Sequence, residues 1–301
     1  MILGAHLGIA KGLPEAVQEL TAIRGEALQI FSKSPQMWSG PPIALAAAEA
    51  FRAAVRTEHV RATAVHHGYL ANLASPKAAG LKRSRATFRD EIARAERLGV
   101  DGLIFHPGAH LNSGVDAGLK RIAESLRLAI DANPEGKVRL LLENAAGQGT
   151  TLGSTFEELQ TVLAAVDTPA RLGVTLDTCH LFAAGWDFRT PELYGRLVDR
   201  VDATVGVGTV RAFHLNDAKA AVGSHLDRHE NIGKGEIGLD GFRPWLADPR
   251  WATTPGYLET PLDDDGYARY AQDLATLRSL VAGGSDARPG HAPPSSSSTV
   301  K

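Results

Sequence analysis

Short apolar runs alternate with amphipathic segments along most of the chain. The runs are four to seven residues long, and several are unbroken apolar stretches, as expected of strands that are buried on both faces. The pattern predicts strands over Ile2–Ala5, Ala27–Phe31, Ala62–His66, Gly102–His106, Val138–Asn144, Leu172–Asp177, Val210–Leu215 and Gly256–Glu259.

The segments between these runs carry signals of helices. Apolar residues recur at helical spacing over residues 81–98, where Gly99 follows as the expected cap, and again over residues 115–129. Residues 154–157 have the pattern of a capping box, and residues 190–191 pair an N-cap threonine with proline. Eight alternations predict an α/β fold with a single (β/α)8 TIM barrel. A doubly wound open sheet is the alternative, because the pattern alone cannot close a barrel.

Composition adds limits to this picture. The chain has 301 residues, of which 44% are hydrophobic and 22% are charged, so it can bury a large core. Residues 1–282 are expected to form the barrel domain, and the Gly-, Pro- and Ser-rich residues 283–301 a disordered tail. We expect a cytoplasmic protein without a membrane span, because no signal-peptide pattern or long apolar run occurs and Cys179 is the only cysteine.

Ionisable residues stand where the predicted strands end. In a TIM barrel these ends form the face that carries function. Seven of the eight expected strands end at or run into a histidine or carboxylate, namely His6, His66, His106, Glu143, Asp177, His214 and Glu259. The second strand is the exception, since it ends in Phe31 and Ser32. A single such residue is more often an ordinary rim residue or helix cap, but seven on one face favour a shared site.

Two local motifs extend this set. Asp177 is followed three residues later by His180, and Asp227 is followed two residues later by His229. Four carboxylates and five imidazoles suit a site with several Zn²⁺ ions, or with Mn²⁺ or Fe²⁺ in one or more positions. Cys179 is interpreted as a buried thiol and not as a ligand, because side chains that flank a ligand tend to point away from the metal.

One further motif does not indicate a binding site. Residues 233–238 match the dinucleotide pattern G-x-G-x-x-G, but they follow a polar loop and not a strand. We interpret them as a flexible loop.

Three segments of the sequence resemble the endonuclease IV family. They are residues 142–149 (LENAAGQG), 173–187 (GVTLDTCHLFAAGWD) and 214–238 (HLNDAKAAVGSHLDRHENIGKGEIG). Residues 4–6, 66–70 and 106–108 are also similar to the family, so the resemblance runs from about residue 1 to 280. It implies a TIM-barrel, metal-dependent apurinic/apyrimidinic endonuclease of base-excision repair.

The resemblance also implies a trinuclear zinc site in which every ligand position is filled. The first ion would take His66, His106 and Glu143, and Glu143 would bridge to the second. The second adds Asp177, His214 and Glu259, and the third takes His180, Asp227 and His229. A hydroxide between the first two ions would attack the phosphorus 5′ to the abasic sugar, leaving a 3′-hydroxyl and a 5′-deoxyribose phosphate. Glu143 and Glu259 are the candidate catalytic carboxylates.

The implied partner is double-stranded DNA that contains abasic sites, bound by a monomer. Three Zn²⁺ would turn the formal charge of −2 into about +4, concentrated at the barrel mouth. Tyr69 and Leu70 match the family's DNA wedge, whereas Gln36 stands where an arginine is expected and Pro35 where a polar residue is expected. This departure bears on affinity, bending and lesion choice more than on hydrolysis. Basic side chains in the mouth loops could contact phosphates or stay solvated, and these are Lys33, Lys219, Arg228 and Lys234.

Two rival functions remain. A sugar isomerase or epimerase would share the barrel and a related metal site, but it would need neither the third ligand set nor a DNA wedge. A metal-loaded protein that binds damaged DNA without cutting it would keep the ligands and lack turnover.

Overall fold

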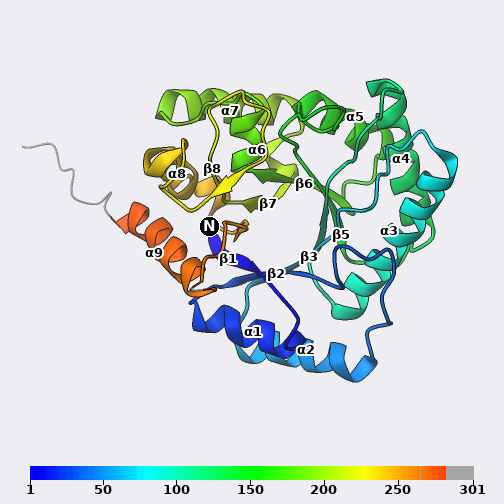
Figure 1. Cartoon of the computed structure of the whole chain (residues 1–301), viewed down its shortest axis with the longest axis horizontal. Helices are drawn as coiled ribbons and strands as arrows, with labels where there is room; N and C mark the ends of the chain where they lie inside the picture. The colour runs from blue at the N-terminus through cyan, green and yellow to red at the C-terminus, as the bar shows by residue number, and fades with distance from the viewer. Residues whose placement is uncertain (265, 283–301) are drawn as a thin grey trace, which may run out of the picture.

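The computed structural model describes residues 1–264 and 266–282 (Figure 1). Within that part of the chain, eight parallel strands close a barrel in the neighbour order β1-β10-β7-β6-β5-β4-β3-β2. The TIM-barrel prediction is confirmed, the open sheet is wrong, and the predicted strand ends differ from the observed ones by at most two residues. The barrel strands are β1 (Ile2–Leu7), β2 (Ala27–Phe31), β3 (Ala62–His66), β4 (Gly102–Phe105), β5 (Arg139–Glu143), β6 (Leu172–Asp177), β7 (Val210–His214) and β10 (Pro255–Leu258).

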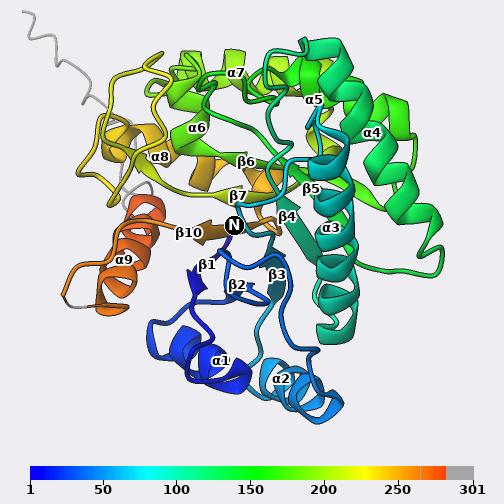
Figure 2. The same cartoon turned by 45° about the vertical axis from the view of Figure 1, so that its right-hand side comes forward.

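Helices surround the barrel and cover the outer face of its strands (Figure 2). A short helix, α6, follows β6 directly, and α9 follows the last barrel strand. The other helices return the chain to the start of the next barrel strand. The helices are α1 (Leu13–Ala22), α2 (Leu45–Thr57), α3 (Ala78–Leu98), α4 (Val115–Asp131), α5 (Phe156–Val166), α6 (Thr178–Ala183), α7 (Pro191–Thr204), α8 (Gly238–Ala247) and α9 (Ala268–Ala282). Within the described residues, none of them has the length and apolar character needed to cross a bilayer. The predicted tail, residues 283–301, lies outside the described residues.

Helix ends largely follow the signals in the sequence. Gly99 ends α3 in the left-handed conformation, with φ of 70°, and the Thr190 side chain accepts a hydrogen bond from the first turn of α7. The capping box before α5 is displaced by one residue from the predicted one. Its N-cap is Thr155, which accepts from the backbone N–H of Glu158, while the Glu158 carboxylate accepts from the N–H of Ser154.

The barrel interior changes from apolar to polar along the strands. A small apolar cluster fills one part of it, made of Ile2, Ala27, Ala62, Ala64, Ile104, Leu141, Ala212 and Tyr257. Glu143 lies two residues after Leu141, and His66 lies two residues after Ala64. Because side chains alternate along a strand, a step of two keeps them on the same face. The strands therefore deliver polar side chains into the interior at their C-terminal ends.

The long connection after β7 contains a short antiparallel hairpin of β8 (Asp217–Ala218) and β9 (His229–Glu230), followed by the glycine-rich loop. This loop is wound around the buried carboxylate of Asp217. That carboxylate accepts the backbone N–H groups of Gly233, Gly235 and Ile237 at 2.9–3.1 Å. A Cβ at position 235 would lie 2.5 Å from Asp217 Oδ1, so glycine is needed there. The interpretation of residues 233–238 as a flexible loop is thus wrong, because these contacts fasten the loop to the barrel.

Removal of the Asp217 carboxylate should destabilise the fold. Asp217→Ala leaves several buried N–H groups without an acceptor, and each such group costs about 1–3 kcal/mol. We expect the free energy of unfolding to fall by about 3 kcal/mol in urea denaturation of the metal-free protein. Glu49→Ala, at an exposed position of α2, is the matched control and should change it by less than about 0.5 kcal/mol. Equal stability of the two variants would contradict this account of the loop.

Candidate metal centre

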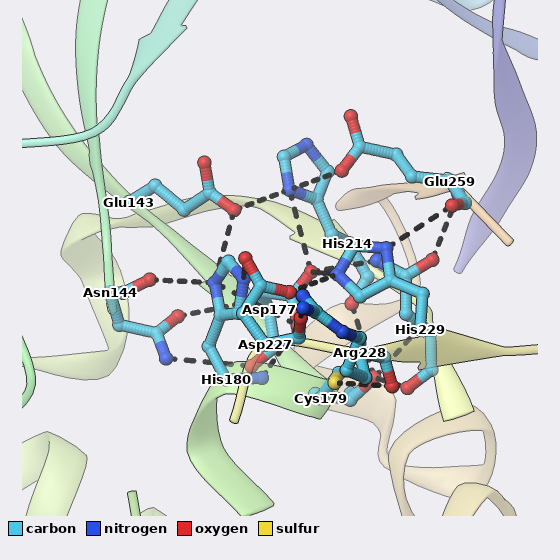
Figure 3. Close-up of polar contacts among 12 residues, drawn as sticks. Glu143, Asn144, Asp177, Cys179, His180, His214, Asp227, Arg228, His229 and Glu259 are labelled. Atoms are coloured by element: carbon cyan, nitrogen blue, oxygen red, sulfur yellow. Dashed lines mark hydrogen bonds and ion pairs between the residues drawn. The ribbon is translucent and has the colours of Figure 1, made fainter. Parts of the chain in front are cut away.

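The C-terminal ends of five barrel strands bring ionisable side chains to one place. Figure 3 shows four of these side chains, Glu143, Asp177, His214 and Glu259, gathered together. β3, β5, β6 and β7 end at His66, Glu143, Asp177 and His214, and Glu259 follows β10 directly. All five lie together at the barrel mouth with the histidine that follows β4, His106. The centre is thus built from side chains that are far apart in the sequence and adjacent in the barrel.

Glu143 lies at the middle of the cluster, and its side chain is fully buried. One oxygen, Oε2, lies 3.1 Å from His66 Nε2 and 3.4 Å from His106 Nδ1. The other, Oε1, lies 2.8 Å from His214 Nδ1 and 3.4 Å from His180 Nδ1. Burial opposes its ionisation, but the imidazoles of His106 and His214 outweigh burial and hold the pKa of Glu143 well below its ordinary value. The Glu143 carboxylate is therefore charged, and each of its two oxygens faces a different pair of histidines.

A second group surrounds His214. Its Nδ1 atom lies 3.4 Å from Glu259 Oε2 and 3.8 Å from Asp177 Oδ2. Burial opposes protonation of His214, but the charges of Glu259 and Glu143 raise its pKa to about 9. Burial likewise opposes ionisation of Glu259, but His214 and His6 lower the pKa of this carboxyl group. Glu143, Asp177, His214 and Glu259 have ligand atoms that all lie within 4.8 Å of one another.

A third group lies beside these two and comes from the loops. His180 is in α6, His229 begins β9, and Asp227 lies just before that strand. The two oxygens of Asp227 lie 3.2 Å from His180 Nε2 and 3.2 Å from His229 Nε2. Burial opposes protonation of His229, but the bond to Asp227 raises its pKa to about 9. The structure therefore brings together all three ligand sets that the sequence predicted.

Backbone carbonyls orient three of the histidines. The Nδ1 atom of His66 lies 2.8 Å from the carbonyl oxygen of His67, and that of His180 lies 2.9 Å from the carbonyl oxygen of Asn144. His229 Nδ1 lies 3.1 Å from the carbonyl oxygen of Glu259. A carbonyl accepts only from a protonated nitrogen, so in each ring Nε2 is left to face the carboxylates. Such hydrogen bonds fix the tautomer of metal-binding histidines.

The donor set fits metal ions well. Carboxylate and imidazole atoms converge here without a lysine or arginine among them, and such ligands suit Zn²⁺, Mn²⁺ and Fe²⁺. Cys179 lies close enough to Asp177 and His229 to complete a group of its own. Its thiol is buried, however, and its Sγ donates to the carbonyl oxygen of Arg228 at 3.6 Å. Burial and the nearby Asp177 raise its pKa, which keeps the thiol protonated and supports its interpretation as a structural residue.

Several buried polar residues of the site were not predicted from the sequence. Asn216 donates to Asp177 Oδ2 at 2.7 Å and accepts from the N–H of Glu259 at 2.9 Å. Asn144 accepts from the N–H of Asp177 at 2.6 Å. Gln29, in β2, contacts both His214 and Glu259. For Gln29 a signal was available, because it is a polar residue inside an apolar strand and lies two residues after Ala27 of the interior cluster.

The predicted wedge lies at the edge of the centre. Tyr69 and Leu70, in the loop after β3, are 64% and 39% exposed, and the ring of Tyr69 lies 6.2 Å from that of His66. A cavity of 590 Å³ opens beside Tyr69 and is also lined by His6, Phe31, Glu259, Tyr267 and Tyr270. Exposed apolar side chains thus stand directly next to the metal-ligand cluster.

The predicted polar and basic DNA contacts divide into two groups. Gln36, Arg228 and Lys234 are exposed, and Lys219 is exposed with its Nζ 3.8 Å from Glu230. Lys33 is different, because its side chain is only 5% exposed and is paired with Glu91 of α3. The sequence left Lys33 either in contact with a phosphate or solvated, and in this structure it is neither, because it is buried against Glu91.

The pairing of Lys33 belongs to a wider set of contacts that hold the loop after β2 against α3. Arg94 donates to the carbonyl oxygens of Ser32 and Pro41, and Thr87 donates to that of Trp38. These contacts fix the loop that presents Gln36.

Comparison with known proteins identifies similar chains. Residues 18–280 match the family described as xylose isomerase-like TIM barrel. The chain is 42% identical over 278 residues to a probable endonuclease 4 from Trichlorobacter lovleyi, which covers 92% of this chain and 99% of that protein. Endonuclease IV from Thermus thermophilus has a solved structure with a TM-score of 0.83 and 34% identity, covering 94% of this chain and 100% of that one. A 3-keto-D-glucoside 4-epimerase from E. coli gives a TM-score of 0.68 at 15% identity, covering 93% and 99%, which is a likeness of fold alone.

Metal binding to this centre should release protons even above neutral pH. His214 and His229 have pKa values of about 9 in the metal-free chain, whereas a metal ligand must be an unprotonated imidazole. Burial opposes protonation of His180, but Asp177 and Asp227 raise its pKa well above the ordinary value. At pH 8 we therefore expect Zn²⁺ to displace about three protons per chain, compared with almost none from histidines of ordinary pKa near 6.5. Calorimetric titration of metal-free protein in buffers with different ionisation enthalpies measures this number. A heat that is the same in every buffer would contradict the expectation.

Proposed function

The chain belongs to the endonuclease IV family, and from that premise we propose that it is a DNA-repair endonuclease acting at abasic sites. The reaction is hydrolysis of the phosphodiester bond 5′ to the lesion, leaving a 3′-hydroxyl and a 5′-deoxyribose phosphate. The proposed cofactor is three zinc ions per chain, and Mn²⁺ or Fe²⁺ in one or more sites is an alternative. The proposed partner is double-stranded DNA, bound by a monomer.

The observation that carries this proposal is the group formed by His180, Asp227 and His229. It lies next to the groups centred on Glu143 and His214, and His180 contacts both Asp227 and Glu143. Proton or hydride shifts on a small sugar need one or two ions, whereas phosphodiester hydrolysis uses cations at both the attacking and the leaving oxygen. A third ligand set therefore favours phosphodiester hydrolysis over the sugar isomerase or epimerase reaction.

Some groups of the centre would supply charge for the reaction, and others hold the ligands in their orientation. Zinc ions at these ligands would supply a hydroxide nucleophile near neutral pH and would neutralise charge on the phosphate oxygens. Glu143 and Glu259 are the proposed catalytic carboxylates, because both line the space between the first two groups. The backbone carbonyls behind His66, His180 and His229 keep these rings in place, so the centre needs little rearrangement to receive a phosphate.

The loops around the mouth would receive the DNA. Tyr69 and Leu70 are exposed beside the centre and could fill the gap that a missing base leaves in the helix. The neighbouring cavity of 590 Å³ has room for an extruded sugar, with Glu259 on its wall. Arg228 and Lys219 are the proposed phosphate contacts, and Gln36 would lie against the duplex from the fixed loop after β2.

The first test uses a DNA duplex with one tetrahydrofuran abasic analogue and an end label. The analogue cannot undergo β-elimination, so a cut requires hydrolysis. We expect the zinc-loaded protein to cut on the 5′ side without added magnesium and to leave a 3′-hydroxyl that a polymerase extends. Intact DNA, bound by protein shown to hold three metal ions, would favour the damage-binding alternative. Intact DNA without binding would direct the search to sugar substrates.

Substitution of Glu259 should separate turnover from DNA affinity. Glu259→Gln keeps the size of the side chain and removes its charge, so we expect kcat to fall at least about 100-fold. The affinity for the abasic duplex should change by less than about threefold, because that affinity would come from the mouth loops. Single-turnover cleavage and fluorescence anisotropy measure the two quantities, with zinc content checked in each sample. Equal losses in rate and affinity would remove Glu259 from the catalytic role.

A further inference from the structure

Gln29 is a fully buried polar residue inside the barrel that is not among the proposed metal ligands. Its neighbours in β2, Leu28 and Ile30, belong to the apolar core outside the barrel, so the Gln29 side chain faces inward. Burial of an amide is unfavourable unless its groups are hydrogen-bonded, and all of the partners of Gln29 belong to the metal centre or touch it.

The contacts of Gln29 determine how its amide is oriented. Its Nε2 atom lies 2.6 Å from Glu259 Oε1, and its Oε1 atom lies 2.9 Å from His214 Nε2. A carboxylate can only accept hydrogen bonds, so the amide nitrogen must face Glu259. The amide oxygen therefore faces His214 and requires a proton on Nε2 of that ring.

This contact selects one tautomer of His214. The other ring nitrogen, Nδ1, faces Glu143, Glu259 and Asp177. When Nε2 carries the proton that Gln29 accepts, Nδ1 of the neutral ring keeps its lone pair for a metal ion. Backbone carbonyls orient His66, His180 and His229. His214 is instead oriented by the side chain of Gln29.

The same amide also selects one oxygen of Glu259. Oε1 lies 2.6 Å from Gln29 Nε2 and 2.9 Å from His6 Nδ1, on the side away from the cluster. Oε2 is left facing His214, with Nδ1 at 3.4 Å. One glutamine thereby holds two ligands of the same proposed metal ion, from two different strands.

We propose that Gln29 is a positioning residue for the second metal ion, fixing the tautomer of His214 and the free oxygen of Glu259. The role rests on the proposed metal centre but not on the nature of the substrate. A buried glutamine with a purely structural role would affect folding and leave metal affinity unchanged. The two roles therefore differ in what they do to metal binding.

The decisive variant is Gln29→Met, which keeps the length of the side chain and removes its hydrogen bonds to His214 and Glu259 as well as its contact with His6. The matched control is Thr175→Val, because Thr175 is also buried and polar in a barrel strand, and its hydroxyl has no hydrogen-bond partner in the described part of the chain. A second variant, Gln29→Glu, keeps an acceptor for His214 and loses the donor to Glu259 when ionised. It serves as a readout if the methionine variant folds poorly.

The measurements are zinc affinity by competition with a chelator, metal stoichiometry, and the visible spectrum of the Co²⁺-loaded protein. Loss of a partner that orients a metal ligand lowers affinity about 10- to 100-fold. We expect Gln29→Met to lose one zinc ion of three at a chelator concentration that wild type and Thr175→Val withstand, and to show an altered cobalt spectrum. Gln29→Glu should alter the cobalt spectrum as well, because its carboxylate repels Glu259.

The outcomes separate this proposal from the proposed function. Native zinc affinity and an unchanged cobalt spectrum in a folded Gln29→Met protein would overturn the role of Gln29, whatever the protein does to DNA. Loss of the second ion, in a protein whose wild type fails to cut abasic DNA, would overturn the nuclease and leave the role of Gln29 in place. A weakened Thr175→Val variant would show that any change in the barrel interior disturbs the metal, which would also overturn it.

Discussion

The buried charge of Glu143 is the constraint on which the rest of the centre depends. A carboxylate without solvent is strongly unfavourable unless cations or hydrogen-bond donors surround it. Here four imidazoles, from His66, His106, His180 and His214, lie within 3.4 Å of its oxygens. The strands that carry three of these contacts must end at the same height, and α6 must begin at once after β6 to deliver His180. Closure of the barrel is therefore what brings the imidazoles to the buried carboxylate.

Most of the fold and the ring of ionisable residues at the strand ends followed from local sequence patterns, whereas the division into three ligand sets was implied by the family resemblance. Apolar runs mark strands buried on both faces, and the residue at the end of each run reaches the mouth of a barrel. The fate of Lys33 could not be read in this way, since Glu91 is 58 residues away in the chain. Gln29 could not be found from the last residue of its strand, because β2 ends in the apolar Phe31 and its inward-facing polar residue lies two positions earlier. The contacts of Lys33 and Gln29 both depend on partners that are distant in the sequence.

The shared barrel also explains why fold alone leaves the reaction open. The 3-keto-D-glucoside 4-epimerase, only 15% identical to this chain, superposes on it with a TM-score of 0.68. The alignment covers 93% of this chain and 99% of the epimerase, so the fold does not identify the reaction, which depends on the side chains that the fold carries. In this chain the third ligand group lies outside the barrel strands, because His180 is in α6, His229 begins β9 and Asp227 lies just before that strand. The reaction proposed for this chain therefore rests on these segments and not on the barrel alone.

The glycine-rich loop after the hairpin, residues 233–238, is built like a site that binds an anion. Its backbone N–H groups surround an anion at the start of α8, an arrangement that in other proteins receives a phosphate. Here the chain supplies its own anion, so Asp217 acts as a built-in mimic of a nucleotide phosphate. Because Asp217 already accepts the N–H groups of Gly233, Gly235 and Ile237, this loop does not offer them to an external phosphate.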